Sequence, residues 1–262
     1  MPASVTTSEG LLDRPKGGLS ASTLKLIACL SMLIDHAGLL LFPGVQILRV
    51  IGRVAFPIFA YFIAEGCRYT RHPLRRYLMI VGLGLVCEVA YYIASGAIEG
   101  TVLVTFALSI PLVHAVTGIK QAIYRRSGRE GLLAGGLLVA ATAVIVLEEI
   151  FIDIDYDYGI FGVLLPVFLA LLDHDTRPGH ETPALFAYLD RKVIRLAVLA
   201  VSILLIWWNR GQNDIQLYAL FSLIPLAFYN GRPGRRGLKY GFYIFYPAHL
   251  VILWLIAQVV GR

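Results

Sequence analysis

LKLIACLSMLIDHAGLLLFPGVQILRVIGRVAFPIFAYF, residues 24–62, consists of two long apolar runs joined by a short Pro-Gly turn. Within these runs lie Asp35, His36 and Arg53. A charge at the centre of a bilayer costs about 3 kcal/mol or more, so such residues face a protein interior or water and are candidates for function. The plainer interpretation is a structural ion pair between Asp35 and Arg53, with His36 packed beside it.

The whole chain has the composition of a polytopic membrane protein. Of its 262 residues, 58% are hydrophobic and only 15% are charged, whereas about 25% are charged in a soluble protein. Apolar runs of about 20 residues cross the hydrocarbon core of a bilayer as helices. The sequence therefore predicts an all-α bundle of about nine transmembrane helices, at residues 22–42, 49–66, 74–94, 101–118, 132–152, 158–173, 191–209, 214–230 and 241–260.

The basic residues predict how this bundle is oriented. They gather in the N-terminal segment and in alternate loops, as the positive-inside rule requires when the N-terminus is cytoplasmic and the C-terminus is outside. Residues 1–20 are polar and lack an apolar signal core, so we expect a disordered cytoplasmic arm followed by one membrane domain at 21–262. The net charge of +6 then indicates contact with anionic lipid of the bilayer and no nucleic acid.

This topology places a cluster of polar side chains in the outer half of the membrane. The candidate catalytic residues are His36, Asp35, Arg53, His249, Glu148, Glu149, Asp157 and Gln216. Imidazole suits proton transfer near neutral pH, and a carboxylate on its far nitrogen would stabilise the imidazolium. Because neighbouring helical residues point about 100° apart, Asp35 is not assured as the partner of His36, and Glu148, Glu149 or Asp157 would serve instead. No metal-ligand spacing is present.

On the inner side, basic residues gather around the loop YNGRPGRRGLKY, residues 229–240. Together with the basic residues that follow the second span, this loop would form a cradle for a phosphorylated cofactor, or would only be an ordinary positive-inside loop. The candidate cofactor-binding residues are Arg68, Arg75, Arg76, Asn230, Arg235, Arg236, Lys239, Tyr240 and Tyr246, of which Tyr246 shares a helix face with His249.

Seven blocks, in this order, resemble the TraX family, whose namesake is the membrane acetylase of conjugative F pilin. They are LKLIACLSMLIDHAG (24–38), GRVAFPIFAYFIAEGCRYTRHPLRRY (52–77), TFAL (105–108), DYGIFGVLL (157–165), IQLYAL (215–220), YNGRPG (229–234) and KYGFYIFYPAHLVIL (239–253). The family is similar in turn to the wider class of transmembrane acyltransferases.

The resemblance implies acetyl transfer, in a bacterial inner membrane, from cytoplasmic acetyl-CoA to an acceptor reached from the outer side. Carried over by motif, Asp35 and His36 of LIDHAG, Arg53 of GRVAFP and His249 of YPAHL are the site residues. We expect His36 to take a proton from the acceptor and Arg53 or Gln216 to polarise the thioester carbonyl, with His249 as the alternative base. A peptide amine, a sugar and a lipid all remain open as the acceptor.

Two other functional classes fit the same residues. Buried Asp, His and Arg also form proton relays, so a proton-coupled secondary transporter is the main alternative. Many transporters show repeated halves with broken helices, and no internal repeat is visible in this sequence. A noncatalytic membrane scaffold is the third reading, and consumption of acetyl-CoA would exclude it.

Overall fold

The computed structural model describes residues 17–98, 100–151, 154, 157–212, 214–235 and 239–261. Within these ranges every regular element is helical, which confirms the all-α prediction. The elements are α2 (Ala21–Leu40), α3 (Gln46–Gly52), α4 (Ala55–Tyr69), α5 (Pro73–Ser95), α6 (Val102–Arg125), α7 (Gly128–Phe151), α8 (Gly159–Leu172), α9 (Leu185–Leu189), α10 (Lys192–Asn209), α11 (Asp214–Leu217), the 3-10 helix η1 (Tyr218–Ser222), α12 (Leu223–Ala227) and α13 (Lys239–Val260).

Seven helical segments in the described part of the chain are long and apolar enough to cross a membrane. They correspond to α2, α3 with α4, α5, α6, α7, α10 and α13. The other two predicted spans coincide with the shorter apolar helices Gly159–Leu172 and Ile215–Ala227. The structure is thus that of a multi-pass membrane protein, while nine crossings and their orientation stay predictions.

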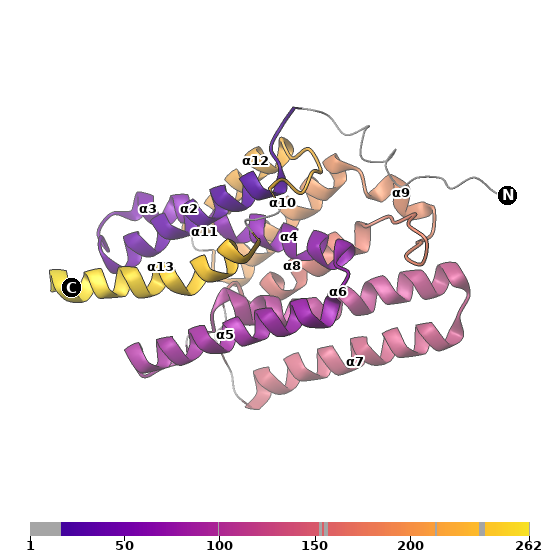
Figure 1. The fold of residues 1–262 in the computed structure, drawn as a ribbon, viewed down its shortest axis with the longest axis horizontal. Coiled ribbons are helices and arrows are strands. Elements are labelled where there is room, and N and C mark those ends of the chain that lie inside the picture. The colour runs from indigo at the N-terminus through magenta and orange to yellow at the C-terminus, as the bar shows by residue number, and fades with distance from the viewer. Residues whose placement is uncertain are drawn as a thin grey trace.

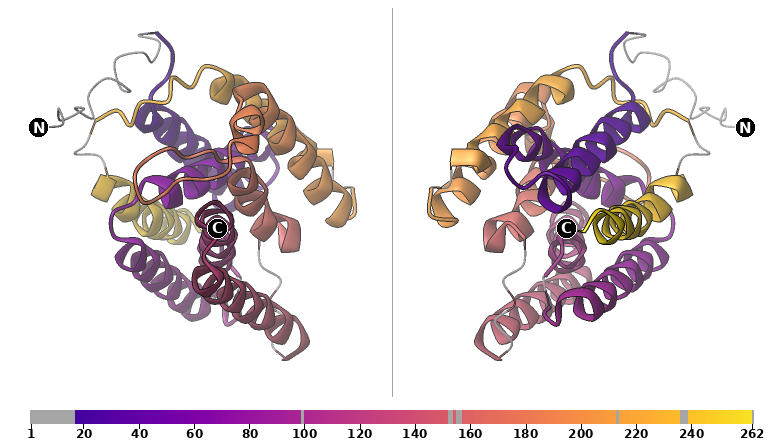
Figure 2. Two further views of the ribbon diagram at one scale, coloured as in Figure 1. Left: turned by 90° about the vertical axis from the view of Figure 1, so that its right-hand side faces the viewer. Right: turned by 90° about the vertical axis from the view of Figure 1, so that its left-hand side faces the viewer.

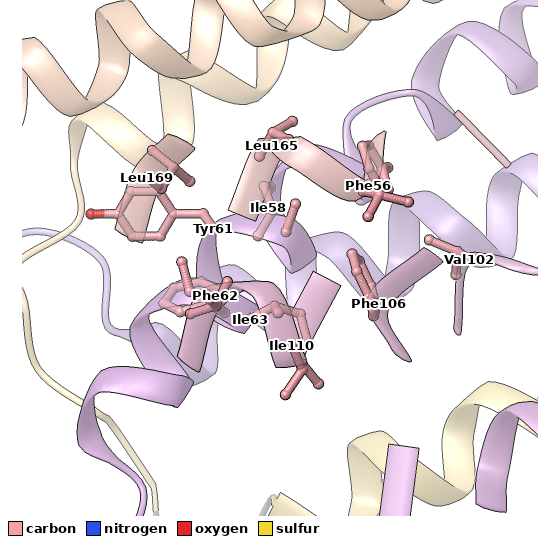
Figure 3. Close-up of a cluster of buried hydrophobic side chains, with 14 of the residues drawn as sticks. Phe56, Ile58, Tyr61, Phe62, Ile63, Val102, Phe106, Ile110, Leu165 and Leu169 are labelled. Carbon is pink, nitrogen blue, oxygen red and sulfur yellow. The ribbon is translucent and has the colours of Figure 1, made fainter. Parts of the chain in front are cut away.

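The long helices run roughly side by side, with α7 at the edge of the bundle, where it packs chiefly on α6 (Figures 1 and 2). α4 lies inside, between α2, α6 and α8. Figure 3 shows its side chains Phe56, Ile58 and Phe62 among those of α6 and α8. Ala60 and Ala64 of α4 are fully buried, because small side chains let neighbouring helices approach closely. This close packing fixes the position of α4 along the bundle axis relative to its neighbours.

Two helices begin within the bundle, beside the middle of α5. Leu103, near the start of α6, packs against Gly84 of α5. The carboxylate of Glu88 on α5 accepts hydrogen bonds from the backbone N–H groups of Gly100 and Thr101. The N–H of Asp157, just before α8, donates to the carbonyl of Gly100 at 2.8 Å. Irregular backbone at membrane depth is tolerated where it lines a cavity, and these two helix starts do so.

At the opposite end, the first described residues pair with the loop before α13. Leu19 N–H donates to the Phe228 carbonyl, and Asn230 N–H donates to the Leu19 carbonyl. The predicted disordered arm covers residues 1–20, of which residues 1–16 lie outside the described ranges. Residues 18–20 therefore form part of the folded end of the molecule.

Candidate functional site

Two cavities lie next to each other in the bundle. The first, which we call the histidine cavity, has a volume of about 170 Å³, and its lining includes Asp35, His36, Arg53 and Asp157. The second, which we call the basic cavity, has a volume of about 510 Å³, and its lining includes Lys25, Tyr69, Arg76 and Arg235. Met32, Phe59 and Tyr246 line both cavities. These three side chains therefore form the boundary at which a ligand in one cavity would meet a ligand in the other.

The two histidines bond directly to each other across α2 and α13. His36 Nδ1 lies 2.9 Å from His249 Nε2, and the ring centroids are 5.0 Å apart. His249 is 3% exposed, and its Nδ1 lies 2.8 Å from the carbonyl oxygen of Phe245. The Phe245 ring stacks on the His249 ring at 4.8 Å. The packing of α13 thus holds His249 in one orientation.

These contacts determine the tautomer of each ring when both are neutral. A carbonyl oxygen only accepts, so His249 Nδ1 carries the proton and His249 Nε2 carries a lone pair. His36 Nδ1 must then donate to that lone pair. His36 Nε2 is left as the basic nitrogen on a residue that lines the histidine cavity. The arrangement can take up one proton at His36, with His249 accepting a hydrogen bond from the resulting imidazolium.

The partner of His36 is therefore His249 and not a carboxylate, because Asp35 is already engaged elsewhere. Arg53 Nη2 donates to both carboxylate oxygens of Asp35, at 2.9 and 2.7 Å. Arg49 Nη1 lies 3.0 Å from Asp35 Oδ2. Gly52 sits against this carboxylate so closely that a Cβ there would lie 2.2 Å from it. Asp35 and Arg53 therefore form the structural ion pair that the sequence analysis gave as the simpler interpretation.

Asp157 and Tyr158 complete the wall of the histidine cavity at the start of α8. Tyr158 adopts a positive φ of 68°, a strained conformation for a side chain of this size, and its ring stacks on Phe56 at 3.7 Å. The carbonyl of Asp157 accepts a hydrogen bond from Thr105 Oγ1 at 2.9 Å. Protein atoms crowd the Asp157 carboxyl although part of its surface stays open, and this burial raises its pKa to about 6, against the opposing effect of Arg53.

Three other predicted catalytic residues do not line the histidine cavity. Glu148 Oε1 accepts from the Ile154 N–H at 2.9 Å, so this carboxylate is engaged with the backbone at Ile154. Glu149 is exposed. Gln216 is buried at 7% exposure, but it lies on α11, outside the residues that form the cavity. α7 packs chiefly on α6, and α11 contacts α3 and α10, so none of these three residues stands in the lining next to His36.

The basic cavity has the composition of a site for an anion with an apolar tail. Arg76 Nη2 donates to the carbonyls of Phe62 and Ile63, while its buried Nη1 has no hydrogen-bond partner in the described part of the chain. Lys25 Nζ lies 5.0 Å from the centroid of the Phe62 ring. Gly66 faces the Arg76 guanidinium, and a Cβ there would lie 2.2 Å from it. Most of the remaining lining is aromatic or aliphatic.

Of the predicted cofactor-binding residues, Arg76, Arg235 and Tyr246 line the basic cavity. Arg75 is exposed and does not line it, and Asn230 Nδ2 donates to the Gly18 carbonyl instead. Arg236 and the side chains of Lys239 and Tyr240 lie outside what the structure describes.

Arg68 belongs to a separate ionic cluster at the end of α4. It lies 2.9 Å from Asp190 Oδ2 and 3.5 Å from Asp173 Oδ1. Arg195, which is 5% exposed, pairs with the same two carboxylates. Lys120 Nζ donates to the carbonyls of Ala170 and Leu171 at the end of α8. This cluster ties the segment between α8 and α10 to the bundle, so Arg68 is already neutralised and is not available to phosphate.

Sequence reasoning missed several residues of the site. Arg49 shares a helix face with Arg53, four residues on, and that spacing was the available signal. Tyr158 and Phe56 sit inside the quoted family blocks, but no chemical feature marks them. Lys25 is a charge inside a predicted span on the same helix stripe as His36, and that was its available signal. Nothing local to the sequence marks Phe59 or Thr101 as cavity residues. Among the described residues, no group of three His, Cys, Asp or Glu could hold a metal ion.

Comparison with known proteins gives three findings. A family model described as TraX protein matches residues 20–257. The probable fimbrial assembly protein FimC, serogroup H1, of Dichelobacter nodosus is 25% identical over 251 residues, which cover 89% of this chain and 94% of the relative. An uncharacterized protein of Rickettsia prowazekii, RP591, is 28% identical over 148 residues, which cover 56% of this chain and 54% of that protein. No solved structure matches the chain.

Proposed function

The chain belongs to the TraX family, and on that premise we propose that it is a membrane acetyltransferase that moves an acetyl group from cytoplasmic acetyl-CoA to an amine or hydroxyl acceptor reached from the outer side. The observation that carries the proposal is the shared boundary of the two cavities at Met32, Phe59 and Tyr246. A donor on one side and an acceptor on the other would meet there, next to His36. Membership of the family supports the same class of reaction.

The basic cavity suits the donor by its chemistry. Arg76 offers an unpaired, buried Nη1, and Lys25 and Arg235 add two further positive charges to the lining. Guanidinium and ammonium groups are the usual partners of phosphate in proteins. The aromatic and aliphatic lining suits the uncharged arm that carries the thioester. Residues from α2, α4, α5 and α13 would therefore hold a ligand that is anionic at one end and mostly apolar along its length.

The histidine cavity supplies the proton chemistry. His36 Nε2 takes the proton from the acceptor nitrogen or oxygen as that atom bonds to the acetyl carbon. The carbon–sulfur bond then breaks, and the leaving thiolate takes the same proton from His36, so the ring ends as it began. His249 accepts the hydrogen bond from the transient imidazolium. No oxidant, metal or additional reactant enters this balance.

The acceptor belongs to the outer side of the membrane. The relative from D. nodosus is named a fimbrial assembly protein, so a surface or pilus component that carries a free amine is the first acceptor to test. A sugar or a lipid hydroxyl is the second. Asp157, on the wall of the histidine cavity, would attract a cationic amine when it is ionised.

The test is acetyl transfer by the purified protein in liposomes. Labelled acetyl-CoA is supplied on one side, peptides, amino sugars or lipids are offered on the other, and products are identified by mass spectrometry. We expect labelled product with the wild type and at least a hundredfold less with His36→Ala, as loss of a general base predicts. His174→Ala is the matched control, because this histidine lies in the segment between α8 and α10, with its Nδ1 against Thr182, and does not line either cavity. Full activity of His36→Ala, or no consumption of acetyl-CoA with any acceptor class, would refute the proposal.

A further inference from the structure

Thr101 is a buried residue of the histidine cavity whose side chain has no structural task that the described residues reveal. It is 5% exposed, it lines the cavity, and its Oγ1 is buried without a hydrogen-bond partner among the described residues. Buried hydroxyl groups are nearly always bonded, because leaving one unpaired costs stability. An unpaired hydroxyl on a cavity wall therefore points to a ligand that is absent from the structure.

Thr101 also lacks the hydrogen bond that a Thr at its position in a helix usually makes. Thr101 is the residue immediately before α6, where a Thr side chain usually accepts a hydrogen bond from the first turn of the helix. No such bond is made here, and the backbone N–H of Thr101 donates instead to Glu88 Oε1 at 2.6 Å. Thr105, one turn later, shows the ordinary behaviour, because its Oγ1 donates to the Asp157 carbonyl at 2.9 Å. The two side chains are chemically identical, but of the two only the Thr101 hydroxyl lacks a hydrogen-bond partner among the described residues.

At Thr101 the N-terminus of α6 meets a carboxylate, because Glu88 accepts hydrogen bonds from the backbone N–H groups of Gly100 and Thr101. Thr101 stands at the N-terminal end of α6, a helix of 24 residues, and the helix dipole places partial positive charge there. Val102, the first residue of α6, also lines the histidine cavity. Glu88 therefore offsets the dipole of α6, and the Thr101 hydroxyl is a neutral donor on a residue that lines the same cavity as His36.

Of the two donors that sequence reasoning assigned to the thioester carbonyl, Arg53 lines the histidine cavity but is engaged by other groups, and Gln216 lies outside the lining. Arg53 Nη2 is shared between the two oxygens of Asp35, and its Nε donates to the Arg49 carbonyl. Gln216 does not line the cavity. The role of donor to the developing negative charge is thus open for a residue that sequence reasoning did not assign.

We propose that the Thr101 hydroxyl, at the start of α6, donates a hydrogen bond to the carbonyl oxygen of the acetyl group during transfer; this inference rests on the proposed function. As the acceptor atom bonds to the acetyl carbon, the carbonyl π electrons move to that oxygen and His36 receives the acceptor proton. The oxyanion accepts the Thr101 hydrogen bond. When the carbon–oxygen double bond reforms, the carbon–sulfur bond breaks and the thiolate takes the proton from His36.

Thr101→Val removes the hydroxyl while keeping the shape of the side chain, and Thr101→Ser keeps the hydroxyl. The loss of one oxyanion donor lowers kcat by about 10²- to 10³-fold. We expect that loss in Thr101→Val, with KM values for both substrates within a few-fold of the wild type, and near-normal kcat in Thr101→Ser. The melting temperature of Thr101→Val should not fall, because the variant removes an unpaired polar group. Thr105→Val is the comparison, and it should melt at a lower temperature because it loses a formed hydrogen bond.

Each outcome of this experiment has one meaning. Wild-type kcat in Thr101→Val overturns the inference and leaves the proposed function standing. Loss of kcat in Thr101→Val together with a lowered melting temperature, as in Thr105→Val, also overturns it, because Thr101 would then have a structural role. A Thr101→Ser variant as slow as Thr101→Val overturns it as well. Absence of acetyl transfer by the wild type overturns the proposed function, and this inference with it.

Discussion

Replacing His249 separates the role of the second histidine from that of the first. His249→Phe keeps an aromatic ring against Phe245 but removes the nitrogen that accepts the hydrogen bond from His36 Nδ1. His36 then loses the contact that selects its tautomer and that stabilises its charged form. We expect His36 to keep its place on α2, since that helix is packed against α4 and α13 independently of this bond.

The size of the effect follows from the kind of bond that is lost. The bond between His36 and His249 becomes charge-assisted when His36 carries the proton, and such a bond contributes about 1.5–3 kcal/mol. Since about 1.4 kcal/mol is a tenfold change in rate, His249→Phe should lower kcat by about 10- to 150-fold. His36→Ala should lower it further, by at least about 10²- to 10⁴-fold, because the base itself is then absent.

His249→Gln provides the matched control. The Gln amide reaches the position of Nε2 and can accept from His36 Nδ1 through its oxygen, so this variant should recover part of the activity that His249→Phe loses. The assay is single-turnover transfer of labelled acetyl in liposomes, with the acceptor saturating. If His249→Phe were as fast as the wild type, or slower than His36→Ala, the assignment of His36 as the base and His249 as its partner would be wrong.

Asp35→Asn should lower the free energy of unfolding by about 3 kcal/mol, because Arg53 would lose the buried charge that it pairs with, and denaturation in detergent measures this change. Arg76→Gln should raise KM for acetyl-CoA by about tenfold or more while leaving KM for the acceptor unchanged, since a charge-assisted bond to phosphate is lost; equal KM values in titrations of wild type and variant would contradict the donor site. Asp157 is exposed, but the protein atoms that crowd its carboxyl desolvate it and raise its pKa from 3.8 to about 6. The folded protein therefore binds more protons than the unfolded chain between these values, and stability should fall as pH rises through this window. Asp157→Asn should flatten that part of the melting-temperature curve, and an unchanged slope would show that Asp157 ionises normally.

Composition and charge pattern predict much of the fold. Apolar segments of spanning length lead directly to a helical membrane bundle, and each expected span coincides with a helix or a run of short helices. The arrangement also brings four expected members of the outer cluster, Asp35, His36, Arg53 and Asp157, to one cavity. The sequence predicts this grouping, because helices that cross a bilayer in alternate directions would place these residues at the same depth.

The pairing of side chains was less accessible to sequence reasoning. The helical periodicity around Asp35 cannot show whether Arg53, Arg49 or His36 is its partner. All three lie in the first two predicted spans, close enough in sequence to contact Asp35. Arg68 looks like an ordinary inner-loop cation, yet it binds Asp173 and Asp190, which are more than a hundred residues away. Such choices depend on which helix faces meet, and lipid-facing and partner-facing surfaces are equally apolar in the sequence.

The sequence by itself determined that this chain is a multi-pass helical membrane protein, because the length of the apolar segments and the cost of burying a charge in lipid are local properties. Only the tertiary structure decided that His36 bonds to His249, 213 positions away, and that α6 and α8 begin inside the bundle. Those features arise from the rotation and height of each helix against its neighbours, which close packing sets for the whole bundle at once.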